Sequence, residues 1–253
     1  MAELKAVIFD QDGVLADTER DGHRVAFNKA FHEFGIDIVW DADYYGTLLK
    51  VGGGKERMRY DFHRRSLKLD IDKIIPLLHK RKTEIFMDIL TAGTLVPRPG
   101  ILRLVKELAS AGLKLAVCST SNEKAVKSLV NKFFGSDQQE IFSLILAGDI
   151  VKKKKPDPEI YFLALQKLGL HPEESLVIED SQIGLKAAKS AGIKCLVTVN
   201  EYTRDEDHQL ADCIVSCLGD SGQDEARQLG GYPVELTSGE VSLKVLKEIV
   251  NYG

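Results

Sequence analysis

From Pro97 onward, short apolar segments alternate with amphipathic helical segments, and this alternation constrains the fold more than any other feature of the chain. Successive strand–helix–strand units predict a parallel sheet with helices on its faces. Glycines follow three of the helical segments, where a left-handed cap is favoured. The predicted strands are 114–118, 143–147, 175–178 and 195–199, the predicted helices are 101–111, 123–134, 159–168 and 183–191, and the glycines are Gly112, Gly169 and Gly192.

An apolar strand ending at Phe9 comes before this region, and the chain between the two reads as consecutive helices without a convincing strand. The predicted helices there are 24–34, 41–49, 55–67 and 72–90. The predicted fold is therefore α/β, with a Rossmann-like doubly wound parallel sheet core and an inserted all-helical cap domain. We expect the core to comprise residues 1–17 and 93–253, and the cap residues 18–92. A last helix over 241–250 is expected to pack on the sheet, whereas 217–236 has weak periodicity.

The composition excludes several classes of function. The formal net charge is −4, with acidic and basic residues mixed along all 253 residues, so no basic surface for nucleic acid is expected. No segment has about 18 unbroken apolar residues, so no membrane partner is expected. Four cysteines in such a length favour reduced thiols. We expect a monomeric cytoplasmic enzyme, or one of the plastid stroma if a transit peptide has been removed.

Polar residues stand where the predicted strands end, and parallel strands bring all their carboxyl ends to one edge of the sheet. Both carboxylates after the first strand can serve one site only if the chain leaves strand geometry there, and Gly13 favours such a turn. Each segment taken singly also fits a plain turn, a helix cap or a solvated loop. Their convergence would make a site from Asp10, Asp12, Ser119, Lys155, Glu179 and Asp180.

These residue types suit transfer of a phosphoryl group. Asp10 would attack phosphorus, and Asp12 would protonate the leaving oxygen and then deprotonate water. Lys155 would neutralise developing charge, and Ser119, at the start of a helix with Thr120 and Asn122, would hold phosphate oxygens. Adjacent carboxylates repel unless a cation lies between them. A Mg²⁺ cofactor is therefore expected, with ligands drawn from Asp10, Asp12 through its carbonyl, Asp180 and Glu179.

Four motifs in this order resemble the haloacid dehalogenase superfamily: Asp10-Gln11-Asp12-Gly13-Val14, Ser119, Lys155-Pro156-Asp157-Pro158 and Glu179-Asp180-Ser181. The presence of Asp12 implies phosphatase or phosphomutase chemistry rather than dehalogenation. Further segments resemble the CbbY-type sugar bisphosphate phosphatases, particularly the plant plastid kind: Asp21–Arg24, Gly52–Arg57, Cys118–Lys124 and Lys153–Pro158. That resemblance implies a small phosphorylated sugar as substrate and hydrolysis of xylulose 1,5-bisphosphate to xylulose 5-phosphate.

The cap would bind the rest of the substrate. Lys55 and Arg57 open a helix after three glycines, where cations and backbone N–H groups could hold a phosphate. The alternative is a glycine turn before a solvated helix. Other cap candidates are Glu19, His23, Arg24 and Lys82. Two other functions stay open, a β-phosphoglucomutase that returns the phosphoryl group to the sugar, and a non-catalytic binding module on the same fold.

Overall fold

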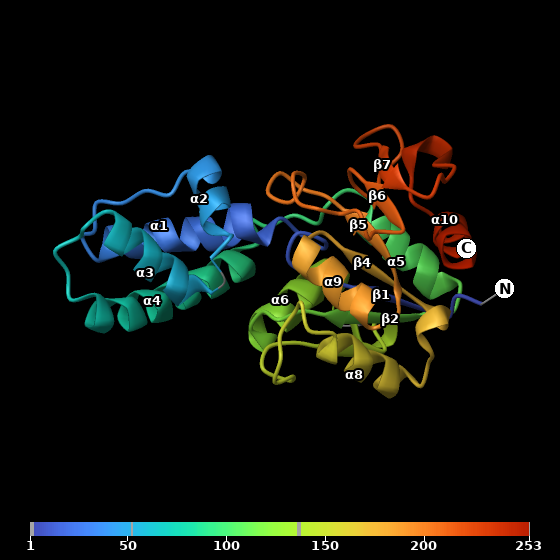
Figure 1. Cartoon of the computed structure of the whole chain (residues 1–253), viewed down its shortest axis with the longest axis horizontal. Coiled ribbons are helices and arrows are strands. Elements are labelled where there is room, and N and C mark those ends of the chain that lie inside the picture. Colours follow the sequence, from blue (N-terminus) through green and yellow to red (C-terminus); the bar gives the residue numbers. More distant parts are fainter. Residues whose placement is uncertain (1–2, 52, 136–137, 253) are drawn as a thin grey trace. The chain divides into compact units, whose positions relative to one another are not determined.

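The computed structural model describes residues 3–51, 53–135 and 138–252 (Figure 1). The chain divides into two compact units. The core unit comprises Met1–Asp17 and Val96–Gly253, and the cap unit is Thr18–Leu95. Gly52, in the glycine run of the cap, lies outside the described residues.

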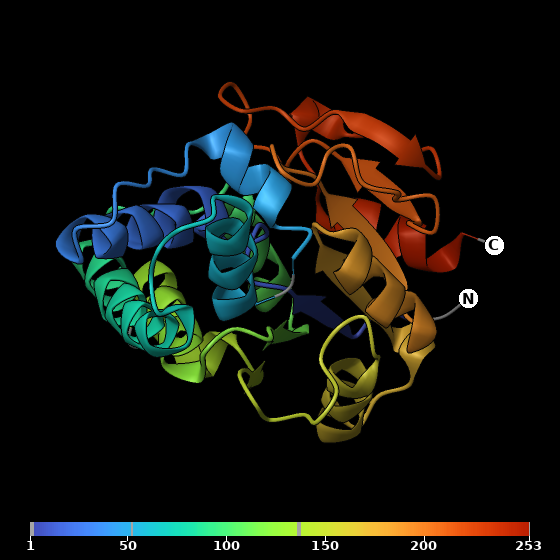
Figure 2. The same cartoon turned by 60° about the vertical axis from the view of Figure 1, so that its left-hand side comes forward.

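The core unit is built on a seven-stranded sheet with the order β3-β2-β1-β4-β5-β6-β7. All neighbouring strands are parallel except the pair β6–β7, which is antiparallel (Figure 2). The predicted α/β fold class is confirmed. The strands are β1 (Ala6–Phe9), β2 (Lys114–Cys118), β3 (Leu144–Leu146), β4 (Ser175–Glu179), β5 (Lys194–Thr198), β6 (Cys213–Val215) and β7 (Gln228–Gly231).

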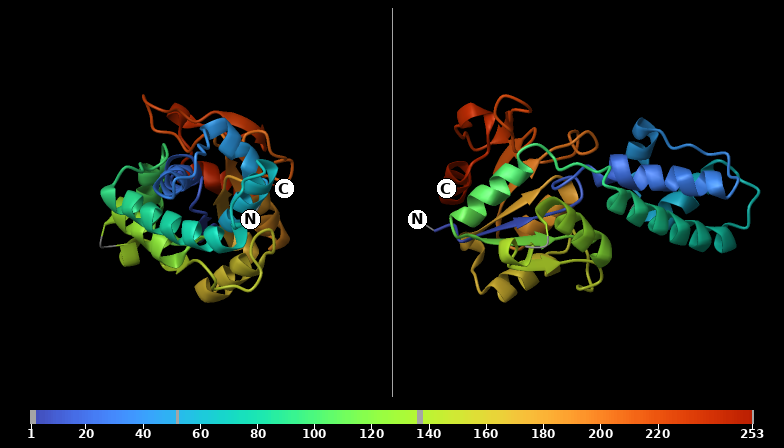
Figure 3. Two further views of the ribbon diagram at one scale, coloured as in Figure 1. Left: turned by 90° about the vertical axis from the view of Figure 1, so that its left-hand side faces the viewer. Right: turned by 180° about the vertical axis from the view of Figure 1, so that it is seen from behind.

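Helices cover both faces of this sheet (Figures 1 and 3). On one face, α8 and α9 share a hydrophobic cluster with Ala6 and Ile8, while α5 and α10 pack on the other face. All four residues of β1 are fully buried, as expected for a strand covered on both sides. The helices of the core are α5 (Ile101–Ser110), α6 (Glu123–Phe134), α7 (Gln138–Ile141), α8 (Glu159–Leu168), α9 (Gln182–Ser190) and α10 (Leu243–Asn251).

The cap unit is helical in all its described elements. A π-helical turn over Glu19–His23 leads into α1 (Arg24–Glu33), followed by α2 (Ala42–Leu48), α3 (Gly54–Arg64) and α4 (Ile71–Ala92). Helices α1 and α4 lie side by side (Figure 3).

An aromatic core holds these helices together. Its centre is Trp40, whose ring lies 4.9 Å from Phe27 and 4.8 Å from Phe31, centroid to centroid. The buried Asp61 accepts hydrogen bonds from Trp40 Nε1 at 2.7 Å and from Arg65 Nε at 2.8 Å.

None of the helices in the described part of the chain combines the length and apolar character that a membrane crossing requires.

Candidate active site

The residues predicted at the strand ends lie together at one edge of the sheet. The Lys155 ammonium donates hydrogen bonds to Asp10 Oδ1 and Glu179 Oε1, each at 2.6 Å, and to the Cys118 carbonyl oxygen at 2.9 Å. Asp10 follows β1, Glu179 ends β4, and Lys155 lies between β3 and α8. The ends of β1 and β4 and the loop before α8 therefore deliver two carboxylates and one ammonium to the same point.

Asp12 lies beside this group on a turn of its own. Strand β1 ends at Phe9, and the turn is closed by hydrogen bonds from Leu15 N to Gln11 O and from Gly13 N to Ala16 O, each at 2.8 Å. Asp12 Oδ2 accepts hydrogen bonds from the hydroxyl groups of Ser119 and Ser121. The carboxylate of Asp12 is thus bound by the loop that follows β2. The contact with Ser121 was missed by the sequence analysis.

Gly13 is the residue that lets the turn close. Its φ is +85°, and a Cβ built on it would lie 2.1 Å from Asp180 Oδ2. We expect Gly13→Ala to lower kcat at least about tenfold, because Asp180 must move to make room. Gly112→Ala is the matched control, since Gly112 has a φ of +79° and no atom within 4 Å of the added Cβ. Both variants carry the left-handed strain of about 1–2 kcal/mol. Equal activity of the two variants, measured as phosphate release, would contradict this role of Gly13.

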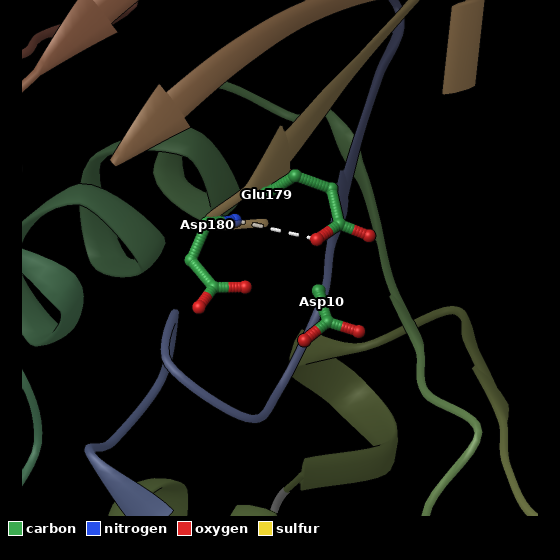
Figure 4. Close-up of side chains that lie close together, drawn as sticks. All are labelled: Asp10, Glu179 and Asp180. Atoms are coloured by element: carbon green, nitrogen blue, oxygen red, sulfur yellow. Dashed lines mark hydrogen bonds between the residues drawn. The ribbon is translucent and has the colours of Figure 1, made fainter. Parts of the chain in front are cut away.

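Three buried carboxylates form a candidate metal centre. Oxygen atoms of Asp10, Glu179 and Asp180 all lie within 4.8 Å of one another (Figure 4). Burial raises the pKa of Asp10 to about 8, opposed by Lys155 and reinforced by the charges of Glu179 and Asp12. Burial, together with the charges of Glu179 and Asp10, raises the pKa of Asp180. Lys155 supplies one positive charge against three carboxylates, so this oxygen-rich site fits a divalent cation.

Glu179 has hydrogen-bond partners on both of its carboxylate oxygens. Its Oε1 accepts from Lys155 and, at 2.6 Å, from the Tyr161 hydroxyl, and its Oε2 accepts from the Asp180 amide at 3.3 Å (Figure 4). The Lys155 ammonium also lies 5.0 Å from the centroid of the Tyr161 ring. Tyr161 was missed because, on the sequence, it is only an apolar position of α8.

Asn200 and Arg98 support the site from outside the predicted motifs. Asn200 Nδ2 donates a hydrogen bond to Asp180 Oδ2 at 2.7 Å. The buried Arg98 guanidinium donates to the carbonyl oxygens of Gly13, Thr198 and Val199. Asn200 follows β5 closely, so the same strand-end argument could have found it. Arg98 precedes a helix and has no comparable signal.

The segment after β2 leads to the N-terminus of α6. Ser119 is buried, and its Oγ accepts a hydrogen bond from the Ser121 amide at 3.1 Å. Asn122 caps α6 by accepting from the amides of Lys124 and Ala125. Thr120 is partly exposed. The N-terminal end of a helix favours an anion such as phosphate, so this segment suits the role predicted for it.

In the cap unit, two pairs of predicted residues are in contact. Lys82 donates a hydrogen bond to His23 Nδ1 at 2.7 Å, and its ammonium lies 4.7 Å from the centroid of the Phe27 ring. Arg57 donates to the Tyr45 hydroxyl at 2.9 Å and forms a 3.5 Å ion pair with Glu19. The charge of Arg57 is therefore partly neutralised inside the cap.

The remaining cap candidates differ in their surroundings. Lys55 is exposed at the start of α3, and together with burial and Lys82 it lowers the pKa of His79. Lys55 and Lys82 thus create a positive potential around His79, whose neutral form is favoured there. Arg24 donates hydrogen bonds to the carbonyl oxygens of Arg20 and Trp40, which gives it a structural role within the cap.

Comparison with known proteins shows the family of this chain. The sequence profile of the haloacid dehalogenase-like hydrolases matches residues 4–192. The chain belongs to this family. It is 49% identical over 222 residues to a CBBY-like protein of Arabidopsis thaliana, covering 85% of this chain and 69% of that protein. It is 31% identical over 193 residues to a phosphorylated carbohydrates phosphatase of Thermotoga maritima, covering 76% of this chain and 83% of that protein.

A solved structure of a family member is also similar. It is CbbY of Rhodobacter sphaeroides, as a D10N mutant in complex with xylulose 1,5-bisphosphate. The two chains are 41% identical, with a TM-score of 0.74, and the match covers 87% of this chain and 96% of that one. The recognition of a CbbY-type member of this family and the prediction of a phosphatase are confirmed.

Proposed function

We propose that this family member is a Mg²⁺-dependent sugar-phosphate phosphatase that acts through an aspartyl-phosphate intermediate, with xylulose 1,5-bisphosphate as its substrate. The observation that carries the chemistry is the buried Asp10–Lys155 pair at 2.6 Å beside two further carboxylates. The substrate is supported by the similarity to CbbY of R. sphaeroides, which was solved with that sugar bisphosphate. The proposed enzyme is a monomer of the cytoplasm or plastid stroma, with no nucleic-acid or membrane partner.

Each residue of the site has a defined task in this reaction. Asp10 Oδ attacks the phosphorus atom and forms the aspartyl-phosphate, while Asp12 donates a proton to the leaving sugar oxygen. Asp12 then takes a proton from the water that cleaves the intermediate. Ser119 and the amides before α6 hold the phosphoryl oxygens, and Lys155 offsets their charge.

Asp10, Asp180 and either Glu179 or the Asp12 carbonyl would hold the Mg²⁺. When bound, the cation neutralises the crowded carboxylates and a phosphoryl oxygen. The acidic cluster consists of Asp10, Glu179 and Asp180, and the sequence analysis predicted Asp12 as a ligand through its carbonyl oxygen. A contribution from Asp12 would therefore come from its main-chain oxygen, since its carboxylate is held by Ser119 and Ser121.

A bisphosphate has a second anionic end, and the cap unit offers cations for it. Lys55 and Lys82 lie near His79, and Lys82 also donates a hydrogen bond to His23 Nδ1. A phosphate bound among these groups would gain from both charges. Arg57, held by Glu19 and Tyr45, is better suited to fixing the cap's shape.

The function is tested by measuring phosphate release from a panel of sugar mono- and bisphosphates with Mg²⁺. We expect selective hydrolysis of xylulose 1,5-bisphosphate, and loss of activity on adding EDTA that excess Mg²⁺ restores. Conversion of β-glucose 1-phosphate to the 6-phosphate with little phosphate release would identify a phosphoglucomutase instead. Ligand binding without turnover of any panel member would favour the binding module.

A further inference from the structure

Asn200, which lies outside the predicted motifs, makes a direct contact with Asp180 of the candidate metal centre. Asn200 Nδ2 donates a hydrogen bond to Asp180 Oδ2 over 2.7 Å. Asp180 follows β4 and is buried, as are the other two carboxylates of the cluster. The side-chain amide of Asn200 occupies one lone pair of Asp180 Oδ2, which fixes the rotation of the Asp180 carboxylate.

Asn200 is itself held in place by the turn that follows β5. The side-chain oxygen Oδ1 of Asn200 accepts hydrogen bonds from the backbone amides of Tyr202 and Thr203 at 2.9 and 3.2 Å. The backbone amide of Asn200 donates to Thr203 Oγ1 at 3.1 Å. The buried His208 ring donates to the Thr203 carbonyl oxygen at 2.7 Å. A donor with all its other polar groups engaged has little freedom to turn away from Asp180.

Hydrogen bonds of Arg98 connect the backbone just before Asn200 to the turn that contains Gly13. Arg98 donates to the carbonyl oxygens of Thr198 and Val199, directly before Asn200, and also to that of Gly13. A Cβ on Gly13 would lie 2.1 Å from Asp180 Oδ2 and 2.6 Å from Asn200 Nδ2. The Asp180–Asn200 contact is therefore packed against Gly13.

The chemical type of the donor matters as well. A lysine or arginine at this position would add a positive charge to the cluster and compete with a bound cation. A neutral amide orients the carboxylate and leaves its negative charge in place. Hydrogen-bond partners of metal-binding carboxylates act in this way, and losing one commonly costs tenfold to about a hundredfold in metal affinity.

We propose that Asn200 is a positioning residue that sets the affinity of the carboxylate cluster for Mg²⁺ by orienting Asp180, with Arg98 fixing the backbone from which Asn200 extends. This inference rests on the Mg²⁺ site of the proposed function. It adds the end of β5 to the parts of the sheet edge that build the site.

The test is direct titration of Mg²⁺ into the metal-free full-length protein by calorimetry, without substrate. We expect Asn200→Ala to weaken Mg²⁺ binding about tenfold or more. The matched control is Asn251→Ala, which makes the same chemical change on an exposed side chain of α10 that donates to the Lys247 carbonyl oxygen. We expect the control to bind Mg²⁺ within about threefold of the unaltered protein.

If Asn200→Ala fails to fold, Asn200→Ser takes its place, because a serine hydroxyl can still accept from the amide two residues on but is too short to reach Asp180. Unchanged Mg²⁺ affinity in the Asn200 variant would overturn the inference, and so would equal losses in that variant and Asn251→Ala. The metal site itself is tested separately by Asp180→Asn. If the unaltered protein and Asp180→Asn bind Mg²⁺ alike, the proposed site is wrong, whatever Asn200 does.

Discussion

Asp10→Asn is expected to lower kcat for phosphate release at least about 10⁴-fold, because an amide cannot form the aspartyl-phosphate. Asp10 Oδ1 is 2.6 Å from the Lys155 ammonium, and its side chain is buried among other carboxylates. The substitution keeps the shape of the side chain and removes one buried negative charge. The fold should therefore be retained, and thermal unfolding of the metal-free variant measures this directly.

Asp72→Asn makes the same chemical change on an exposed side chain of the cap that pairs only with Arg59 in the contacts described. This control should keep full activity. Turnover by Asp10→Asn at a rate near that of the control would show that Asp10 is not the nucleophile. Thermal unfolding of Asp10→Asn distinguishes loss of the nucleophile from loss of the fold, because only the latter abolishes the unfolding transition.

Lys155→Met is expected to lower both activity and stability. The Lys155 side chain is 7% exposed and lies 2.6 Å from the carboxylates of both Asp10 and Glu179. Its removal leaves those buried carboxylates without a cation, which typically destabilises a protein by about 3–5 kcal/mol. We also expect kcat to fall at least about 100-fold, since the charge on the transferring phosphoryl group loses its partner.

Urea unfolding of the metal-free proteins measures the stability part. The neighbouring Lys154 provides the comparison, because its side chain is 51% exposed and pairs with an even more exposed Asp149. Lys154→Met should change the free energy of unfolding by about 0–1 kcal/mol. Equal unfolding midpoints for the two methionine variants would contradict the role assigned to Lys155.

Much of the core could be predicted because its signals are local. The helices 123–134 and 159–168 have the predicted ends, and the strand-end argument found residues that the structure brings together. Strands β6 and β7 were missed, since they have three and four residues, and β7 reads Gln-Leu-Gly-Gly. A short edge strand without β-branched residues leaves little pattern to recognise.

Asn200 apart, the supporting contacts of the site depend on long-range pairing and could not be predicted. Arg98 lies 85 residues from Gly13 and 101 from Val199, and nothing in the local sequence marks its guanidinium as buried. Arg57 was a predicted phosphate ligand, yet its ion-pair partner Glu19 lies 38 residues away. Charge pairing of this kind depends on tertiary structure, whereas strand-end position can be predicted from the order of elements.

The order of strands in the sheet has a consequence for synthesis of the protein. Strand β1 is made first, yet its two neighbours in the sheet are β2 and β4, which pair with Ala6 through Lys114 and Ser175. The carboxylate cluster therefore cannot assemble on a growing chain until Asp180 has left the ribosome. The ring contacts at the centre of the cap join Phe27, Phe31 and Trp40, which lie close together in the sequence. We therefore expect the cap to become ordered before β2 and β4 have been synthesised and can pair with β1.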